Sequence, residues 1–252
     1  MIEVTNLKVR NYLVIEQLRI ERGKMVALCG ANGAGKSTLL ETLAGYIVPN
    51  VGQVEFLGKS LASFSVADLA LYRSWLSQQP QQRVYLSVYQ QLHLCAHTLG
   101  DSAQPLARKV IDEIIEQLSL TPLLNRRLVE LSGGELQRVS LASILVGSDL
   151  RLKPEHCLLL LDEPLSALDP QFQHVVIHLL QSRCQQGQSI LLSLHDLNLA
   201  TFYAMDVLLL HQGRHKITGP AQQVLTAQRL AELFGVSMAQ ISINGHTQLI
   251  LA

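Results

Sequence analysis

Residues 30–37 read Gly-Ala-Asn-Gly-Ala-Gly-Lys-Ser and directly follow an apolar run over residues 25–29. The apolar run predicts a strand, and residues 36–44 predict a helix that ends near Gly45. A glycine-rich turn between a strand and a helix, closed by Lys and Ser, fits the pattern G-x-x-x-x-G-K-[ST]. The pattern indicates a loop that binds the phosphate groups of a nucleotide.

The chemistry of this loop follows from its residue types. Glycines allow the backbone angles that turn successive N–H groups inward toward phosphate oxygens, and the helix N-terminus adds partial positive charge. The ammonium group of Lys36 can reach the β- and γ-phosphates, and the hydroxyl of Ser37 can bind Mg²⁺. The residues predicted to bind the nucleotide are Gly30, Ala31, Asn32, Gly33, Ala34, Gly35, Lys36, Ser37 and Thr38.

A second anchor for a metal–nucleotide complex follows the apolar run at residues 158–161, where Asp162 and Glu163 precede Pro164. In open α/β sheets, ligands bind at the carboxyl ends of the strands. We expect Asp162 to hold Mg²⁺ through water and Glu163 to polarise an attacking water as a general base. The alternative, solvation of a strand end, is weakened by the wholly apolar strand.

Composition narrows the class of protein. The 252 residues carry 20 basic and 20 acidic side chains, and this zero net charge argues against nucleic acid as the main partner. The hydrophobic fraction is 48%, but no apolar run reaches the roughly 18 residues of a membrane span, and we expect no signal peptide.

Four scattered cysteines make a disulfide framework or zinc site improbable. Two histidine pairs at i, i+4 spacing, His93/His97 and His174/His178, are best read as solvated helix surface.

The strand pattern is interrupted in the middle of the chain. Residues 79–147 carry almost no strand signal, and apolar residues recur there at helical period. Apolar runs without alternation return at 157–161, 190–194 and 207–210, as expected for parallel strands covered on both faces. Residues 221–234 predict a helix, followed by a final strand pair around Gly245.

We therefore expect one α/β domain over residues 1–252, with a mostly parallel sheet and helices on both of its faces. Residues 1–78 and 148–252 form the predicted nucleotide-binding core. Residues 79–147 form an inserted helical subdomain.

A third motif, Leu131-Ser132-Gly133-Gly134-Glu135, lies far from the first two in the sequence. Ser132 is placed as the N-cap of a helix, and the two glycines leave backbone N–H groups bare at its start. The motif predicts a second anion site on the same chain, and the alternative is an ordinary capped helix.

These motifs together resemble the nucleotide-binding subunits of ABC transporters, whose signature reads LSGGQ, with glutamate here at the fifth position. The resemblance covers roughly residues 2–235. It implies a P-loop NTPase core with an N-terminal antiparallel β part. It also implies a head-to-tail homodimer that holds each ATP between the phosphate loop of one subunit and Ser132, Gly133 and Gly134 of the other.

The remaining functional positions of the family are carried over from the resemblance. Gln78, or its neighbour Gln79, matches the glutamine that joins the core to the helical insert, and Gln78 is the expected ligand to Mg²⁺. Residues 166–169, with Asp169, match the loop that crosses the dimer interface. His195 matches the switch histidine that contacts the γ-phosphate. Tyr12 is the candidate for stacking on adenine.

The resemblance implies an ATPase that energises transport through separate subunits. The order of features is similar to the importer group for cobalamin and iron siderophores, and most similar to the cobalamin importers. The expected partners are a second copy, two transmembrane permease subunits and a periplasmic substrate-binding protein, with the chain at the cytoplasmic face of the inner membrane. Alternatives are an iron-siderophore or haem importer of the same group, an ABC-type ATPase that acts on nucleic acid or ribosomes, and a P-loop kinase.

Overall fold

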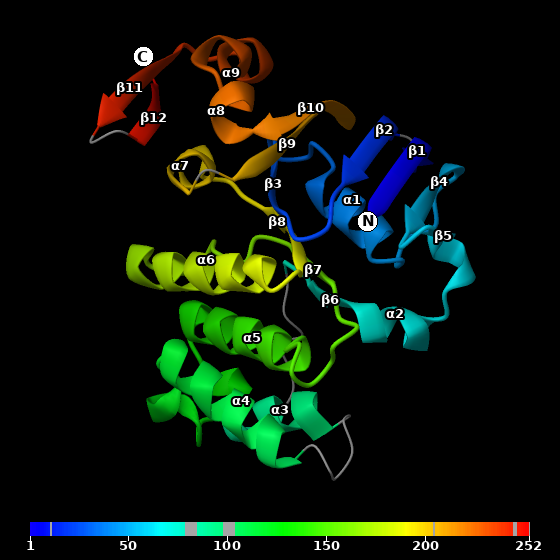
Figure 1. Ribbon diagram of the computed structural model, residues 1–252. Helices are drawn as coiled ribbons and strands as arrows, with labels where there is room; N and C mark the ends of the chain where they lie inside the picture. Colours follow the sequence, from blue (N-terminus) through cyan, green and yellow to red (C-terminus); the bar gives the residue numbers. More distant parts are fainter. Residues whose placement is uncertain (11, 79–84, 98–103, 204, 244–245, 252) are drawn as a thin grey trace.

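A computed structural model describes residues 1–10, 12–78, 85–97, 104–203, 205–243 and 246–251. Within these ranges, ten strands form one sheet in the order β5-β4-β1-β2-β10-β9-β3-β8-β7-β6 (Figure 1). The strands are β1 Ile2–Val9, β2 Leu13–Ile20, β3 Met25–Cys29, β4 Val51–Phe56, β5 Lys59–Ser60, β6 Arg73–Leu76, β7 Leu158–Leu161, β8 Ser189–Ser193, β9 Asp206–His211 and β10 Arg214–Pro220. The helices are α1 Lys36–Leu43, α2 Val66–Tyr72, α3 Val88–His97, α4 Gln104–Gln117, α5 Gly133–Gly147, α6 Pro170–Gln185, α7 Leu197–Phe202, α8 Ala221–Val224 and α9 Ala227–Phe234.

The parallel part of the sheet consists of β9, β3, β8, β7 and β6. Its strands are buried on both faces, which explains why the sequence shows continuous apolar runs rather than alternation. Alternate residues of one strand enter two different cores. Leu159 and Leu161 pack in a core with α5 and α6, whereas Leu158 and Leu160 pack in another with α1. The expected α/β class, with helices on both faces, is confirmed.

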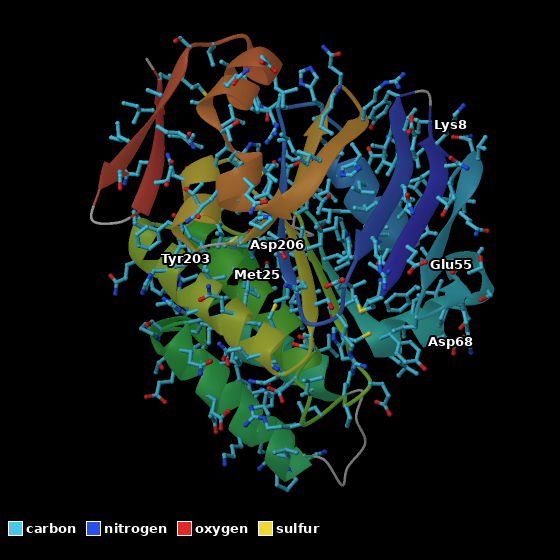
Figure 2. All side chains as sticks on the ribbon, turned by 45° about the horizontal axis from the view of Figure 1, so that its top comes forward. Lys8, Met25, Glu55, Asp68, Tyr203 and Asp206 are labelled. Carbon is cyan, nitrogen blue, oxygen red and sulfur yellow. The ribbon has the colours of Figure 1, made fainter. Side chains whose placement is uncertain are left out.

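The N-terminal strands form the antiparallel part of the sheet, in which β1 pairs with both β2 and β4. Their burial alternates, with Val4 and Val54 inside and Glu3 outside. Figure 2 shows Lys8 and Glu55 at the outer edge of this part. Strand β10 joins the two parts, because it pairs antiparallel with β9 and, at Arg214 and Val14, parallel with β2.

Helices α3, α4 and α5 contact one another and gather at one end of the molecule (Figure 1). Each buries an apolar stripe; on α4 this consists of Ala107, Val110, Ile111, Ile114 and Ile115. Helix α5 is also in contact with β6, so the helical segment and the sheet share one continuous core.

The C-terminal region differs from the sequence prediction in one respect. The single helix expected over residues 221–234 is two helices, because α8 ends before Leu225 and α9 starts after Thr226. The Thr226 hydroxyl accepts a hydrogen bond from the backbone N–H of Arg229 and so caps α9. The predicted strand pair is present as β11 Met238–Ile243 and β12 His246–Leu251, and Gly245 lies outside the described residues.

The sheet brings the carboxyl ends of β3, β6, β7 and β8 to one edge, because these strands run parallel. The phosphate loop, Gln78, Asp162 and His195 follow these four strands in turn. No helix in the described part of the chain is long and apolar enough to cross a membrane.

His156 is buried just before β7 and is 1% exposed. Its Nε2 lies 2.9 Å from the hydroxyl of Ser74, and its Nδ1 lies 3.1 Å from the amide nitrogen of Gln188. The pKa of the imidazole is lowered to about 3, mainly by burial and to a smaller extent by the nearby charges of Lys153 and Arg183. The native state therefore holds this histidine neutral.

His156 should make the protein acid-sensitive. Its pKa is about 6.5 when unfolded and about 3 when folded, so the free energy of unfolding should fall as the pH drops below 6.5. The expected loss is about 2 kcal/mol between pH 7 and pH 5. Urea denaturation at both pH values should show a smaller loss for His156→Asn than for the wild type. His178→Asn, at an exposed position, should behave as the wild type. An equal pH dependence of wild type and His156→Asn would refute this role.

Candidate nucleotide site

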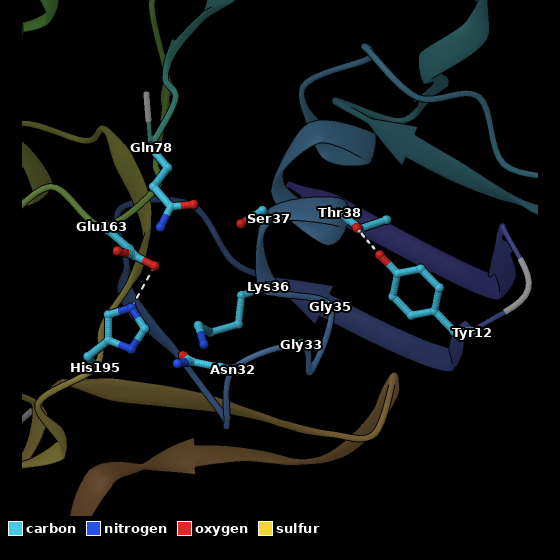
Figure 3. Close-up of a pocket in the computed structure, with 10 residues that line it drawn as sticks. All are labelled: Tyr12, Asn32, Gly33, Gly35, Lys36, Ser37, Thr38, Gln78, Glu163 and His195. Atoms are coloured by element: carbon cyan, nitrogen blue, oxygen red, sulfur yellow. Dashed lines mark hydrogen bonds and ion pairs between the residues drawn. The ribbon is translucent and has the colours of Figure 1, made fainter. Parts of the chain in front are cut away.

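A cavity of about 480 Å³ opens at the carboxyl edge of the parallel strands (Figure 3). It is lined by Tyr12, Asn32, Gly33, Gly35, Lys36, Ser37, Thr38, Gln78, Glu163 and His195. Residues from five separate parts of the sequence thus meet at one place, which is where ligands bind in sheets of this kind.

The phosphate loop depends on glycine at two positions in particular. Gly30 has φ 153°, and a Cβ there would lie 2.3 Å from the carbonyl oxygen of Leu210. Gly35 has φ 96° and precedes α1 directly. Both conformations are strained for any residue with a side chain, so the loop can keep this shape only with glycine. The N-terminal N–H groups of α1 have no intrahelical partners, and its first residues Lys36, Ser37 and Thr38 line the cavity.

Lys36 is 7% exposed, and its ammonium group donates hydrogen bonds to the carbonyl oxygens of Gly30 at 2.8 Å and Ala31 at 3.2 Å. Burial lowers the pKa of Lys36, and the carboxylates of Glu163 and Asp162 oppose this shift. The Lys36 ammonium can bond to a phosphate oxygen, whereas the two carboxylates beside it leave an excess of negative charge that favours a metal cation.

The acidic pair after β7 is fixed by the neighbouring strand β8. The hydroxyl of Ser193 donates to Asp162 Oδ1 at 2.6 Å and accepts from the backbone N–H of Glu163 at 2.7 Å. Asp162 is 3% exposed and lies beneath the cavity rather than among its lining residues. Glu163 has φ 50°, a left-handed conformation that costs a non-glycine residue about 1 kcal/mol or more.

Glu163 also contacts His195. Its Oε1 lies 2.5 Å from Nε2 of His195, which follows β8 (Figure 3). The side chain of Glu163 is 14% exposed and that of His195 is 45% exposed. An imidazole N–H that donates to the carboxylate orients it toward the cavity.

Gln78 lines the cavity at the end of the segment after β6. Its neighbour Gln79, the other predicted candidate, lies outside the described residues. Tyr12 lines the opposite side, and its hydroxyl is hydrogen-bonded to that of Thr38. The ring is 42% exposed.

The third motif forms the helix start that the sequence predicts. The Ser132 hydroxyl accepts from the backbone N–H of Glu135, and the Glu135 carboxylate accepts from the N–H of Ser132. A Cβ at Gly134 would lie 2.8 Å from the carbonyl oxygen of Ala167, so glycine allows α5 to approach that loop closely. Asp169, at the end of the same loop, caps α6 through the N–H of Phe172. Ser132, Gly133, Gly134 and Asp169 do not line the cavity of their own chain.

Two residues that hold the site were not predicted from the sequence. Ser193 is the anchor described above, and its only signal is a polar residue at the end of an apolar strand. Gln137 on α5 is 8% exposed and donates to the carbonyl oxygen of Pro164 at 2.9 Å. This bond connects the helix of the third motif to the loop that carries Glu163.

The cavity fits a magnesium ion by its donor chemistry. Ser37 and Gln78 line it, and the charge of the Asp162 carboxylate acts on Lys36, another of its lining residues. Hydroxyl, amide and carboxylate oxygens are the ligands that Mg²⁺ takes, usually few per ion with water completing the shell. Among the described residues, no group of three or more His, Cys, Asp or Glu side chains is arranged to hold a metal ion.

Sequence comparison agrees with the geometry. The family model for ABC transporters matches residues 16–166. The chain is 36% identical over 232 residues to the vitamin B12 import ATP-binding protein BtuD of Shigella boydii serotype 4, covering 92% of this chain and 90% of that protein. It is 36% identical over 231 residues, with the same coverage, to the protein of that name from Escherichia coli O139:H28.

Solved structures give the same fold. An ATP-binding subunit of an ABC transporter aligns with a TM-score of 0.77 at 26% identity, covering 94% of this chain and 95% of that one. A dimeric ATP-binding cassette bound to ADP and Pi aligns with a TM-score of 0.73 at 23% identity, covering 88% and 99%. The chain belongs to the ABC transporter family. It is an ATPase of that family, and the cavity at the edge of its parallel strands is the candidate nucleotide site.

Ser193 should be a major contributor to stability despite its small side chain. Ser193→Ala removes one donor from a buried carboxylate and one acceptor from a backbone N–H, which should cost about 1–3 kcal/mol in the free energy of unfolding. Ser140→Ala is the matched control, because that hydroxyl only donates to the carbonyl of Leu136 within α5. Urea denaturation measures both. Equal stability of the two variants would contradict the anchoring role.

Proposed function

We propose that the chain is the ATP-hydrolysing subunit of an importer for cobalamin, and that two copies hold ATP between them. The observation that carries the catalytic part is the meeting of Lys36, Glu163 and His195 in one cavity. The proposal for cargo is supported by the relatives named vitamin B12 import ATP-binding protein, which are 36% identical over 92% of the chain.

In the proposed site, residues 30–38 bind the phosphates through backbone N–H groups and Lys36. Ser37, Gln78 and Asp162 hold Mg²⁺, which neutralises phosphate charge when bound. Tyr12 packs against the adenine base.

Hydrolysis requires a base beside the γ-phosphate, and Glu163 is the group proposed for it. The carboxylate takes a proton from water as the water oxygen bonds to the γ-phosphorus. The bond from that phosphorus to the bridging oxygen breaks, and ADP and phosphate are the products. His195 orients the carboxylate through the 2.5 Å contact and reaches toward the γ-phosphate.

The second copy completes the proposed site. Gly133 and Gly134 open α5, where backbone N–H groups lack intrahelical partners, yet neither they nor the N-cap Ser132 line the cavity of their own chain. A head-to-tail partner would bring this anion site, and the loop that ends at Asp169, to the terminal phosphate.

The proposed transport partners are two transmembrane permease subunits, reached from the periplasm by a substrate-binding protein. The chain would then lie at the cytoplasmic face of the inner membrane. The helices before and after Gln78 expose apolar side chains, with Leu71 on α2 51% exposed and Tyr89 on α3 50% exposed. Exposed apolar groups on the elements that precede and follow a cavity-lining residue in the chain suit a partner that responds to the nucleotide.

Replacing Glu163 with Gln tests the general base. Phosphate release should fall by a factor of about 10²–10⁴, and ATP should accumulate in a dimer detectable by sedimentation. Glu155→Gln, at an exposed site before β7, is the control and should hydrolyse ATP normally. Sustained hydrolysis by Glu163→Gln would exclude this residue as the base.

Growth on external cobalamin tests the cargo. A strain that lacks this chain and depends on cobalamin uptake should stop growing at limiting vitamin and recover with the wild-type chain, but not with Lys36→Ala. Undiminished uptake of labelled cobalamin in the deletion strain, with loss of ferric-siderophore or haem uptake, would reassign the cargo.

A further inference from the structure

In the proposed dimer, the triphosphate of ATP approaches the start of α5, where the third motif carries the negative charge of Glu135. Glu135 lies in the first turn of α5, three residues after the N-cap Ser132. Its Oε2 accepts from the N–H of Ser132 at 2.7 Å, so the carboxylate is fixed at the helix start. A first-turn carboxylate stabilises a helix, but it repels a phosphate that approaches the same terminus.

Arg126 occupies the other oxygen of this carboxylate. Its Nη1 lies 2.9 Å from Glu135 Oε1, and its Nη2 donates to the backbone carbonyl of Glu130. One guanidinium therefore bridges the acid and the chain just before the motif. The side chains of Arg126 and Glu135 are 41% and 22% exposed, so the pair borders the surface on which the motif lies.

The segment that carries Arg126 is itself anchored. The backbone N–H of Arg126 donates to the carbonyl of Leu123 at 2.9 Å, and its carbonyl accepts from Val88 at the start of α3 at 3.0 Å. These bonds fix the backbone of Arg126, from which the guanidinium reaches Glu135 on α5. An ion pair made by a flexible surface arginine contributes little to stability, whereas an arginine on a fixed backbone can hold its carboxylate partner in one geometry.

We propose that Arg126 is a positioning residue that neutralises Glu135 and holds its cap, so that the Ser132 motif can accept the γ-phosphate of ATP bound to a second copy. This inference rests on the proposed function. The ion pair makes a glutamate at position 135 compatible with phosphate binding, because the carboxylate keeps the capping geometry while Arg126 compensates its charge. Loss of Arg126 should therefore weaken ATP-dependent dimerisation only when residue 135 carries a charge.

A double-mutant cycle tests this dependence in the full chain carrying Glu163→Gln, with ATP and Mg²⁺ as the ligands and sedimentation as the readout. Arg126→Met should raise the ATP concentration for half-maximal dimerisation at least tenfold. The same substitution combined with Glu135→Gln should raise it less than threefold relative to Glu135→Gln alone. Arg126→Lys, which retains the charge, should stay within threefold of the parent.

Arg127→Met is the matched control, because it removes the same charge one residue away and should leave dimerisation unchanged. Thermal unfolding of each variant reports whether the helical segment remains folded. An equal effect of Arg126→Met in both backgrounds, or no effect in either, would overturn the role of Arg126. A parent that does not dimerise with ATP would instead contradict the proposed function, so the two failures are distinguishable.

Discussion

The bond between Ser193 and the loop after β7 is the interaction on which the site depends. An all-apolar strand delivers Asp162 to an interior where a carboxylate is costly to bury without a donor. The hydroxyl of Ser193 supplies that donor and also accepts from the N–H of Glu163, which adopts φ 50°. One side chain on β8 therefore fixes the two acids that follow β7, and His195 two residues after Ser193 completes the arrangement.

Two hydrophobic cores pack against the strands whose ends form the site, and the third motif lies on a separate helix, α5. Helix α1 and the N-terminal strands share one core with the parallel strands, and α5 and α6 pack in the core on the opposite face of those strands. Gln137 spans from α5 to the carbonyl of Pro164, and Gly134 lies against Ala167. The loop between β7 and α6 thus carries the acid pair and contacts the helix that starts at Ser132, and it links the two proposed anion sites physically.

Sequence patterns predicted those features that depend on residues close together in the chain. The strand over residues 25–29, the phosphate loop and the N-cap at Ser132 follow from spacing, glycine and capping residues, and all three are present. The pairing of Arg214 with Val14 and the bond of Ser193 to Asp162 join residues far apart in the chain, so no local pattern indicates them. The break between α8 and α9 had a signal in Thr226, a good N-cap, that the helical period obscured.

The central claim is that one copy supplies the phosphate loop and the other supplies the Ser132 helix start. A structure of the Glu163→Gln chain with ATP and Mg²⁺ tests it most directly. We expect a head-to-tail dimer in which Ser132 and Gly134 of one subunit contact the γ-phosphate held by Lys36 of the other. An ATP-bound dimer whose Ser132 helix starts face solvent, away from both nucleotides, would contradict it.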